Sequence, residues 1–187
     1  MSLKLFRSTG FHSILTPGEA RLALHPGWAV AIAAGWIGVA CNVWFWHALG
    51  GRTEQLPAAV GAALTMAGAA GFVLSLLGWR RTFKAAATGL LLLGALLAGG
   101  VLTQDLPPEL LVDSGLRLST LMPTWASLFQ WQVPSLLVLL GLLPVLYLWN
   151  LQLRRLPGSA QWRTNLAGMV TWALVFACGF AALYALS

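Results

Sequence analysis

Few side chains in this sequence of 187 residues could carry out chemistry, and they form no catalytic set that we recognise. Glu109 and Asp113 are four residues apart, so on a helix they would share a face and could act as general acid and base. No nucleophile or metal cluster accompanies them, so a solvated acidic face is the simpler interpretation. His12, His25 and His47 provide neither facing haem ligands nor a four-ligand zinc site. We therefore predict no catalytic residue and no metal site.

Asn42 is the polar residue that most needs a partner, because it lies in an apolar run from Ala40 to Trp46. An unpaired amide inside a membrane is costly. Two interpretations stay open: a hydrogen bond to a neighbouring helix, or contact with a lipid head group that enters from the outer leaflet. Cys41 and Cys178 also lie in apolar runs, where free thiols packed as small hydrophobes are favoured over a bridge.

The composition indicates the element type that must position these residues. Hydrophobic residues make up 58% of the chain and charged residues 9%, whereas a soluble domain carries about 25% charged residues. The apolar runs do not alternate in polarity, which excludes an outer-membrane barrel. We predict an all-α polytopic membrane protein, a five-helix bundle with short interfacial helices. The predicted spans, each of roughly 20 residues, are 28–49, 56–79, 85–102, 131–149 and 166–186.

The basic residues predict the orientation of these spans, because Lys and Arg concentrate on the cytoplasmic side. Most of them fall in segments that the five spans place on one side: Lys4, Arg7, Arg21, Arg80, Arg81, Lys84, Arg154, Arg155 and Arg163. The N-terminus is therefore expected in the cytoplasm and the C-terminus in the periplasm. This topology accounts for the net charge of +6, so no nucleic-acid partner is inferred.

Two segments outside the spans have patterns of their own. Residues 1–25 are predicted to form a cytoplasmic amphipathic segment, with Thr16 as a helix N-cap, and residues 26–187 form the membrane domain. The outer loop 103–130 is too apolar for a solvated loop and should lie on the membrane or on the bundle. In it Asp105 is expected to cap the helix that follows. A further helix is expected to run through Pro134 into the fourth span, with a kink there.

Small residues and tryptophans indicate how the spans pack and where they end. Two repeats at three- and four-residue steps predict close helix contacts: Gly61, Thr65, Gly68 and Gly71 in the second span, and Ala173, Ala177 and Ala181 in the fifth. Indole rings at the ends of spans anchor them at the membrane interface. These anchors are Trp28, Trp79, Trp131 and Trp149.

Three short elements accompany this layout. They are Asn-x-x-Phe at residues 42–45, Gly-Val at 100–101 leading to Asp105, and the run 141–149 followed by two arginines. With five spans, they make the chain resemble the N-terminal membrane domain of the lipid A phosphoethanolamine transferases. These bacterial inner-membrane enzymes include the mobile colistin-resistance enzymes.

The resemblance implies a membrane domain that anchors a periplasmic catalytic domain and presents phosphatidylethanolamine at the outer leaflet, with lipid A as acceptor. The family's threonine nucleophile and zinc lie in that other domain, so this chain is expected to hold no cofactor and to be inactive alone. The resemblance implies lipid contact at Asn42, Phe45, Asp105 and Glu109. The alternative is a non-catalytic scaffold or accessory protein, because Pro108 and Leu111 stand where the family has Met and Asn.

Overall fold

The computed structural model describes residues 23–51, 53–79, 82–112, 117–153 and 157–186. In these ranges the regular structure is helical except for one parallel pair of two-residue strands, and turns or short loops connect the elements. In chain order the elements are β1 (Ala23–Leu24), α3 (Pro26–Gly35), the π-helix η1 (Trp36–Ala40), α4 (Val43–Leu49), the 3-10 helix η2 (Thr53–Gln55), α5 (Leu56–Leu76), α6 (Phe83–Gln104), the 3-10 helix η3 (Pro108–Leu111), α7 (Leu118–Leu121), α8 (Trp125–Leu128), α9 (Gln132–Leu136), the π-helix η4 (Leu137–Leu142), α10 (Leu143–Asn150), β2 (Gln152–Leu153) and α11 (Gly158–Tyr184).

The predicted all-α membrane architecture is confirmed. Four helices are long and apolar enough to cross a membrane: Thr53–Leu76, Phe83–Gln104, Gln132–Asn150 and Gly158–Tyr184. The first predicted span is divided into Pro26–Ala40 and Val43–Leu49, which meet at an angle of 58°. Counted as one bent span, this pair brings the total to five.

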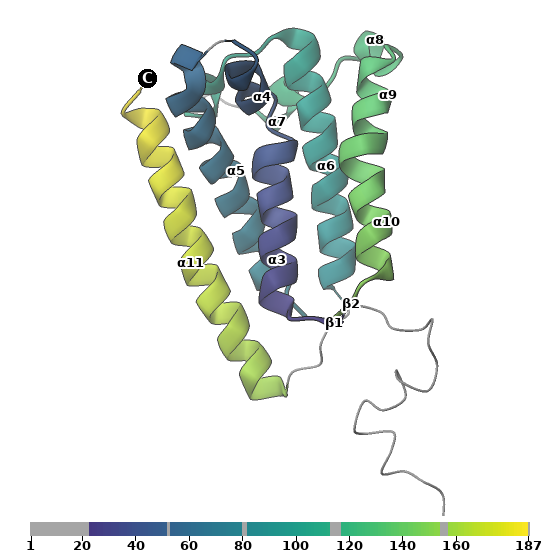
Figure 1. The fold of residues 1–187 in the computed structure, drawn as a ribbon, viewed down its shortest axis with the longest axis vertical. Helices are drawn as coiled ribbons and strands as arrows, with labels where there is room; N and C mark the ends of the chain where they lie inside the picture. Colours follow the sequence, from purple (N-terminus) through teal and green to yellow (C-terminus); the bar gives the residue numbers. More distant parts are fainter. Residues whose placement is uncertain (1–22, 52, 80–81, 113–116, 154–156, 187) are drawn as a thin grey trace, which may run out of the picture.

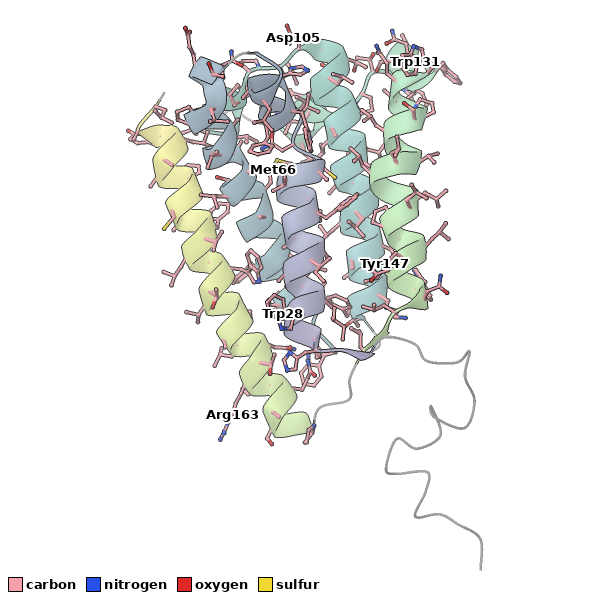
Figure 2. All side chains as sticks on the ribbon, in the orientation of Figure 1. Trp28, Met66, Asp105, Trp131, Tyr147 and Arg163 are labelled. Carbon is pink, nitrogen blue, oxygen red and sulfur yellow. The ribbon has the colours of Figure 1, made fainter. Side chains whose placement is uncertain are left out.

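The long helices stand side by side in a bundle (Figure 1). α5 packs against α11 on one side and against α3 and η1 on the other, while α6 packs against α9, η4 and α10. We name the two ends of the bundle after residues labelled in Figure 2. Trp131 also lies at the Asp105 end, and Trp28 also lies toward the Arg163 end. Separate clusters of buried apolar side chains lie near each end and between them.

The small residues of α5 form its contact with α11, as the sequence predicts. A Cβ atom added at Gly68 would collide with the backbone of Phe176, and one at Gly71 would collide with the Trp172 ring. The second repeat was assigned the wrong role: its members are exposed on α11, namely Ala173, Ala177 and Ala181. The side of α11 that meets α5 instead carries Gly179, which approaches Thr65, and Leu183, which meets Gly61.

The connection into the fourth span also differs from the prediction. α8 ends at Leu128 and α9 begins only at Gln132, so the helix that runs through Pro134 is not continuous with α8. Pro134 lies in the first turn of α9, where a missing backbone N–H disturbs no helical hydrogen bond. The chain therefore turns before the proline and enters the span without the predicted proline kink.

Some of the other predictions are confirmed, and some concern residues outside the described ranges. Both cysteines are free thiols, Cys41 buried and Cys178 exposed. The four anchoring tryptophans are exposed near the ends of their helices, at 28, 79, 131 and 149. The predicted helix capped by Thr16, and most of the amphipathic segment 1–25, lie outside the residues that the structure describes.

Candidate functional site

The candidate site begins at the break in the first span. Here η1 ends at Ala40 and α4 starts at Val43 in a new direction. A π-helix is rare, and such turns are frequent at functional sites. The Trp46 indole donates to the carbonyl oxygen of Ala40 at 3.2 Å, so the carbonyl at the end of η1 has a partner. The carbonyl exposed by the break is thus bonded within the protein.

Asn42 holds the two sides of this break. Its Oδ1 accepts a hydrogen bond from the backbone N–H of Phe45 at 3.1 Å, which makes it the N-cap of α4. Its Nδ2 donates to the carbonyl oxygen of Ala59 on α5 at 3.0 Å. The residue is 1% exposed. Of the two interpretations left open by the sequence, the structure thus shows the hydrogen bond to a neighbouring helix.

A second connection ties α4 to the segment that follows α6. The Trp44 indole donates to the carbonyl oxygen of Leu106 at 2.6 Å. Gly100 lets another part of this segment approach α6, because an added Cβ would collide with the carbonyl of Leu121. Gln104 then donates from its side chain to the carbonyl oxygen of Met122 at 2.8 Å. These contacts place the predicted outer loop on the bundle.

Asp105 and Glu109 lie in this segment. Asp105 is exposed and ends α6 in the left-handed conformation, with φ of 48°. It is therefore the C-cap of α6 and not the N-cap of the next helix, which starts at Pro108. An aspartate tolerates this conformation better than most residues because its short side chain can hydrogen-bond locally. Glu109 belongs to η3.

The four sequence-predicted residues share the Asp105 end of the bundle. Phe45 packs against a buried cluster that also receives Leu106 and Leu111, the apolar neighbours of Asp105 and Glu109. The structure thus connects α4 with the segment that carries both acids. At this end a buried apolar cluster thus lies against the chain segment that contains Asp105 and Glu109.

Exposed aromatic side chains border this end. Trp125 and Phe129, in and just after the short helix α8, are exposed, as is Trp131 before α9 (Figure 2). Thr124 caps α8 by accepting a hydrogen bond from the backbone N–H of Ser127. Aromatic rings with this placement suit a membrane interface.

Some residues that organise the bundle were missed by the sequence analysis. Trp36 in η1 donates from its indole to the carbonyl oxygen of Leu140 in η4 at 3.0 Å, which joins two π-helices far apart in the chain. Asn165 of α11 is buried, and its Nδ2 has no hydrogen-bond partner among the described residues. Trp36 lies in mid-span among apolar residues, and Asn165 lies just before the predicted start of the fifth span at 166, so neither was marked as a buried polar partner.

The described part of the chain contains no group of three or more His, Cys, Asp or Glu residues placed to hold a metal ion. Comparison with known proteins supplies no further assignment: no family model, curated protein or solved structure matches this chain. The described geometry at this end is an exposed Asp105 beside exposed aromatic side chains, over a buried apolar cluster.

Proposed function

We propose that this chain is the membrane domain of a phosphoethanolamine–lipid A transferase and presents phosphatidylethanolamine at the outer leaflet of the bacterial inner membrane. The observation that carries the proposal is the break at Asn42. It turns α4 by 58° at the Asp105 end and brings Phe45 into one cluster with the segment that follows α6. Broken membrane helices recur at binding sites because they bring backbone and side chains together at one place.

The chemistry of the donor lipid suits this surface. The ammonium of ethanolamine is a cation, and the exposed residue Asp105 is an acid at this end, with Glu109 in the adjacent η3. The acyl chains would contact the apolar side chains and the aromatic border. In this proposal Asn42 supports the site by fixing α4, since its amide already bonds Phe45 and Ala59.

Native mass spectrometry of the detergent-purified chain tests the proposal, with phosphatidylethanolamine compared against phosphatidylglycerol. We expect selective retention of phosphatidylethanolamine and a several-fold loss of that selectivity in Asp105→Asn. Glu54→Gln is the matched control, because Glu54 is an exposed acid of η2 at the same end. Equal retention of the two lipids by the unaltered chain would contradict the proposal.

A scaffold or accessory role is the second candidate, favoured because both amide atoms of Asn42 already form hydrogen bonds to the protein itself. If the chain is a scaffold, we expect it to retain the two lipids equally and to co-purify with a partner membrane protein. The same mass spectra thus separate the two candidates.

A further inference from the structure

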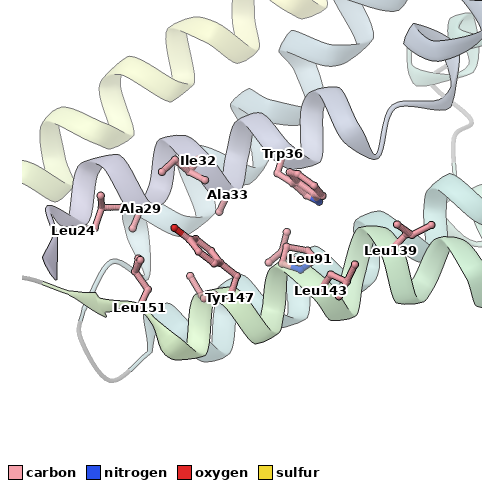
Figure 3. A pocket seen from close by; sticks show the side chains of 12 residues that line it. Leu24, Ala29, Ile32, Ala33, Trp36, Leu91, Leu139, Leu143, Tyr147 and Leu151 are labelled. Carbon is pink, nitrogen blue, oxygen red and sulfur yellow. The ribbon is translucent and has the colours of Figure 1, made fainter. Parts of the chain in front are cut away.

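A groove between α3 and α10 lies outside the candidate site. It forms a cavity of about 380 Å³. Its floor is formed by buried side chains, Ala29, Ala33 and Leu91, and its margins by exposed ones such as Ile32, Leu139 and Leu143. Trp36 and Tyr147 project into the space between the two helices (Figure 3). The other lining side chains are hydrocarbon.

Connections at both ends keep this groove open. At one end the hydrogen bond from Trp36 to Leu140 joins η1 to η4. At the Arg163 end β1 pairs with β2, with Leu24 opposite Leu153. Between these connections α3 packs on α5 and α10 packs on α6, so the two walls belong to different halves of the bundle. The coincidence of two rare π-helices at one connection indicates a built site.

The volume of the groove can be compared with the volumes of a helix and of an alkyl chain. From Leu140 to Leu151 the helical wall is about 16 Å long. A second helix about 10 Å wide would fill on the order of 1,250 Å³ over that length, which is several times the cavity. An extended alkyl chain about 4 Å across fills roughly 200 Å³. The volume of the groove is therefore that of one to two hydrocarbon chains and well below that of a helix.

A charge lies at the Arg163 end of the groove. The Lys84 ammonium donates to the carbonyl oxygens of Trp149 and Leu151, at 3.0 and 2.9 Å, and lies 5.7 Å from the centroid of the Trp149 ring. Leu151 itself lines the groove. A cation beside an apolar groove complements a phospholipid, whose phosphate is anionic and whose tails are hydrocarbon.

We propose that the groove between α3 and α10 binds one acyl chain of a membrane phospholipid whose phosphate lies toward Lys84. A lipid tail can enter the groove from the bilayer through the exposed margin. Inside the groove it makes dispersion contacts with lining atoms that would otherwise have no neighbour on that side. The Tyr147 hydroxyl, directed across the groove, suits an ester carbonyl of the bound lipid. This site is separate from the Asp105 end and does not depend on the proposed transferase role.

Photolabelling tests the proposal on the full chain in vesicles of phosphatidylethanolamine and phosphatidylglycerol. A phospholipid with a diazirine in mid-chain is irradiated, and the labelled residues are mapped by peptide mass spectrometry. We expect labelling of the peptides that contain Ile32 and Leu143 to exceed that of the exposed face of α11 at Val170 and Leu174. Uniform labelling would overturn the proposal.

A matched pair of variants gives the sharper comparison. Leu143→Trp fills the groove, while Leu146→Trp places the same ring on the same helix outside the lining, and the two leucines are 52% and 53% exposed. We expect Leu143→Trp to lower labelling of the groove by at least about fivefold, because the indole ring would occupy the space that the acyl chain needs. Leu146→Trp should leave labelling unchanged.

Further outcomes decide what occupies the groove. Ala33→Leu fills it from the opposite wall, so it should also lower labelling if Leu143→Trp fails to fold. Labelling that is equal in both Trp variants, or crosslinks that place a second copy of the chain at Leu143, would overturn the lipid assignment. Asp105→Asn should leave groove labelling unchanged, so failure of the proposed transferase role and failure of this site are distinguishable.

Discussion

Two buried asparagines show how differently one residue type is used in this bundle. Asn42 uses both amide atoms, one toward Phe45 and one toward Ala59. Asn165 accepts a hydrogen bond from Gln161 at 2.8 Å, but its Nδ2 is unpaired among the described residues. A buried donor without a partner costs about 1 to 3 kcal/mol, whereas a satisfied N-cap stabilises its helix.

Alanine substitutions at these two positions should therefore have unequal effects. Asn42→Ala removes the N-cap and the bond to α5, so we expect a loss of roughly 1 to 3 kcal/mol in the free energy of unfolding. Asn165→Ala removes an unpaired donor together with one bond, so its effect should be much smaller. Thermal unfolding of the two variants in the same detergent measures the difference.

Asn42→Ser provides the control for that comparison. Serine keeps a side-chain oxygen for the N-cap but is too short to reach the Ala59 carbonyl, so its stability should fall between those of Asn42 and Asn42→Ala. If Asn165→Ala destabilised the chain as much as Asn42→Ala, the hydrogen-bond assignment at the break would be wrong.

The Trp44 indole is a second residue with a measurable role. Trp44→Phe keeps an aromatic ring but loses the bond to the Leu106 carbonyl, so we expect about 1 kcal/mol less stability. Hydrogen exchange should rise in residues 105–112, which this bond ties to α4. Trp28→Phe, exposed at the Arg163 end, is the control and should change neither measurement. Unchanged exchange in Trp44→Phe would show that the segment is held by packing alone.

At the scale of elements, the contact between α5 and α11 depends on the absence of side chains. Gly68 and Gly71 admit the Phe176 backbone and the Trp172 ring, while most of α11 is exposed. Without a hydrophobic driving force between helices in lipid, close packing of small residues supplies the attraction. α11 is therefore held along one narrow face.

Gly68→Leu should separate these helices. A side chain at this position collides with the backbone of α11, so we expect a loss of at least about 1 to 3 kcal/mol. Ala69→Leu, on the exposed side of the same helix, is the matched control and should be neutral. Thermal unfolding compares them. Ala177→Leu on the exposed side of α11 should also be neutral, and strong destabilisation there would contradict the packing observed.

At the scale of the whole molecule, basic residues lie at both ends of the bundle, since Arg117 precedes α7 at the Asp105 end. Lys84 and Arg163 lie toward one end, and Asp105 lies at the other (Figure 2). By the positive-inside rule, the larger number of basic residues in the segments on the Arg163 side predicts that this end faces the cytoplasm. The orientation in the membrane stays a prediction from the basic residues.

Cysteine labelling in cells tests this orientation. In a chain carrying Cys41→Ala and Cys178→Ala, we expect Thr53→Cys to react with an impermeant maleimide in intact spheroplasts. Ser159→Cys should react only after permeabilisation. Both positions are exposed, Thr53 in η2 and Ser159 at the start of α11. The reverse pattern would place the Asp105 end in the cytoplasm.

The sequence by itself determined the element types and their approximate limits. Apolar runs of about 20 residues with few charges leave a helix as the way to satisfy every backbone group in lipid. The tryptophans near the span ends and the small residues of α5 also follow from local sequence, because each acts through its own size or polarity.

Only the tertiary structure decided which faces pack and which polar groups pair. Lipid tails and neighbouring helices are equally apolar, so composition does not distinguish the packed Gly68 from the exposed Ala177. The bond from Asn42 to Ala59 and the bond from Trp36 to Leu140 each join residues of different helices. The second of these bonds lies at one end of the groove. Hydropathy is a local property, whereas a hydrogen-bond partner or a groove exists only once the helices are assembled.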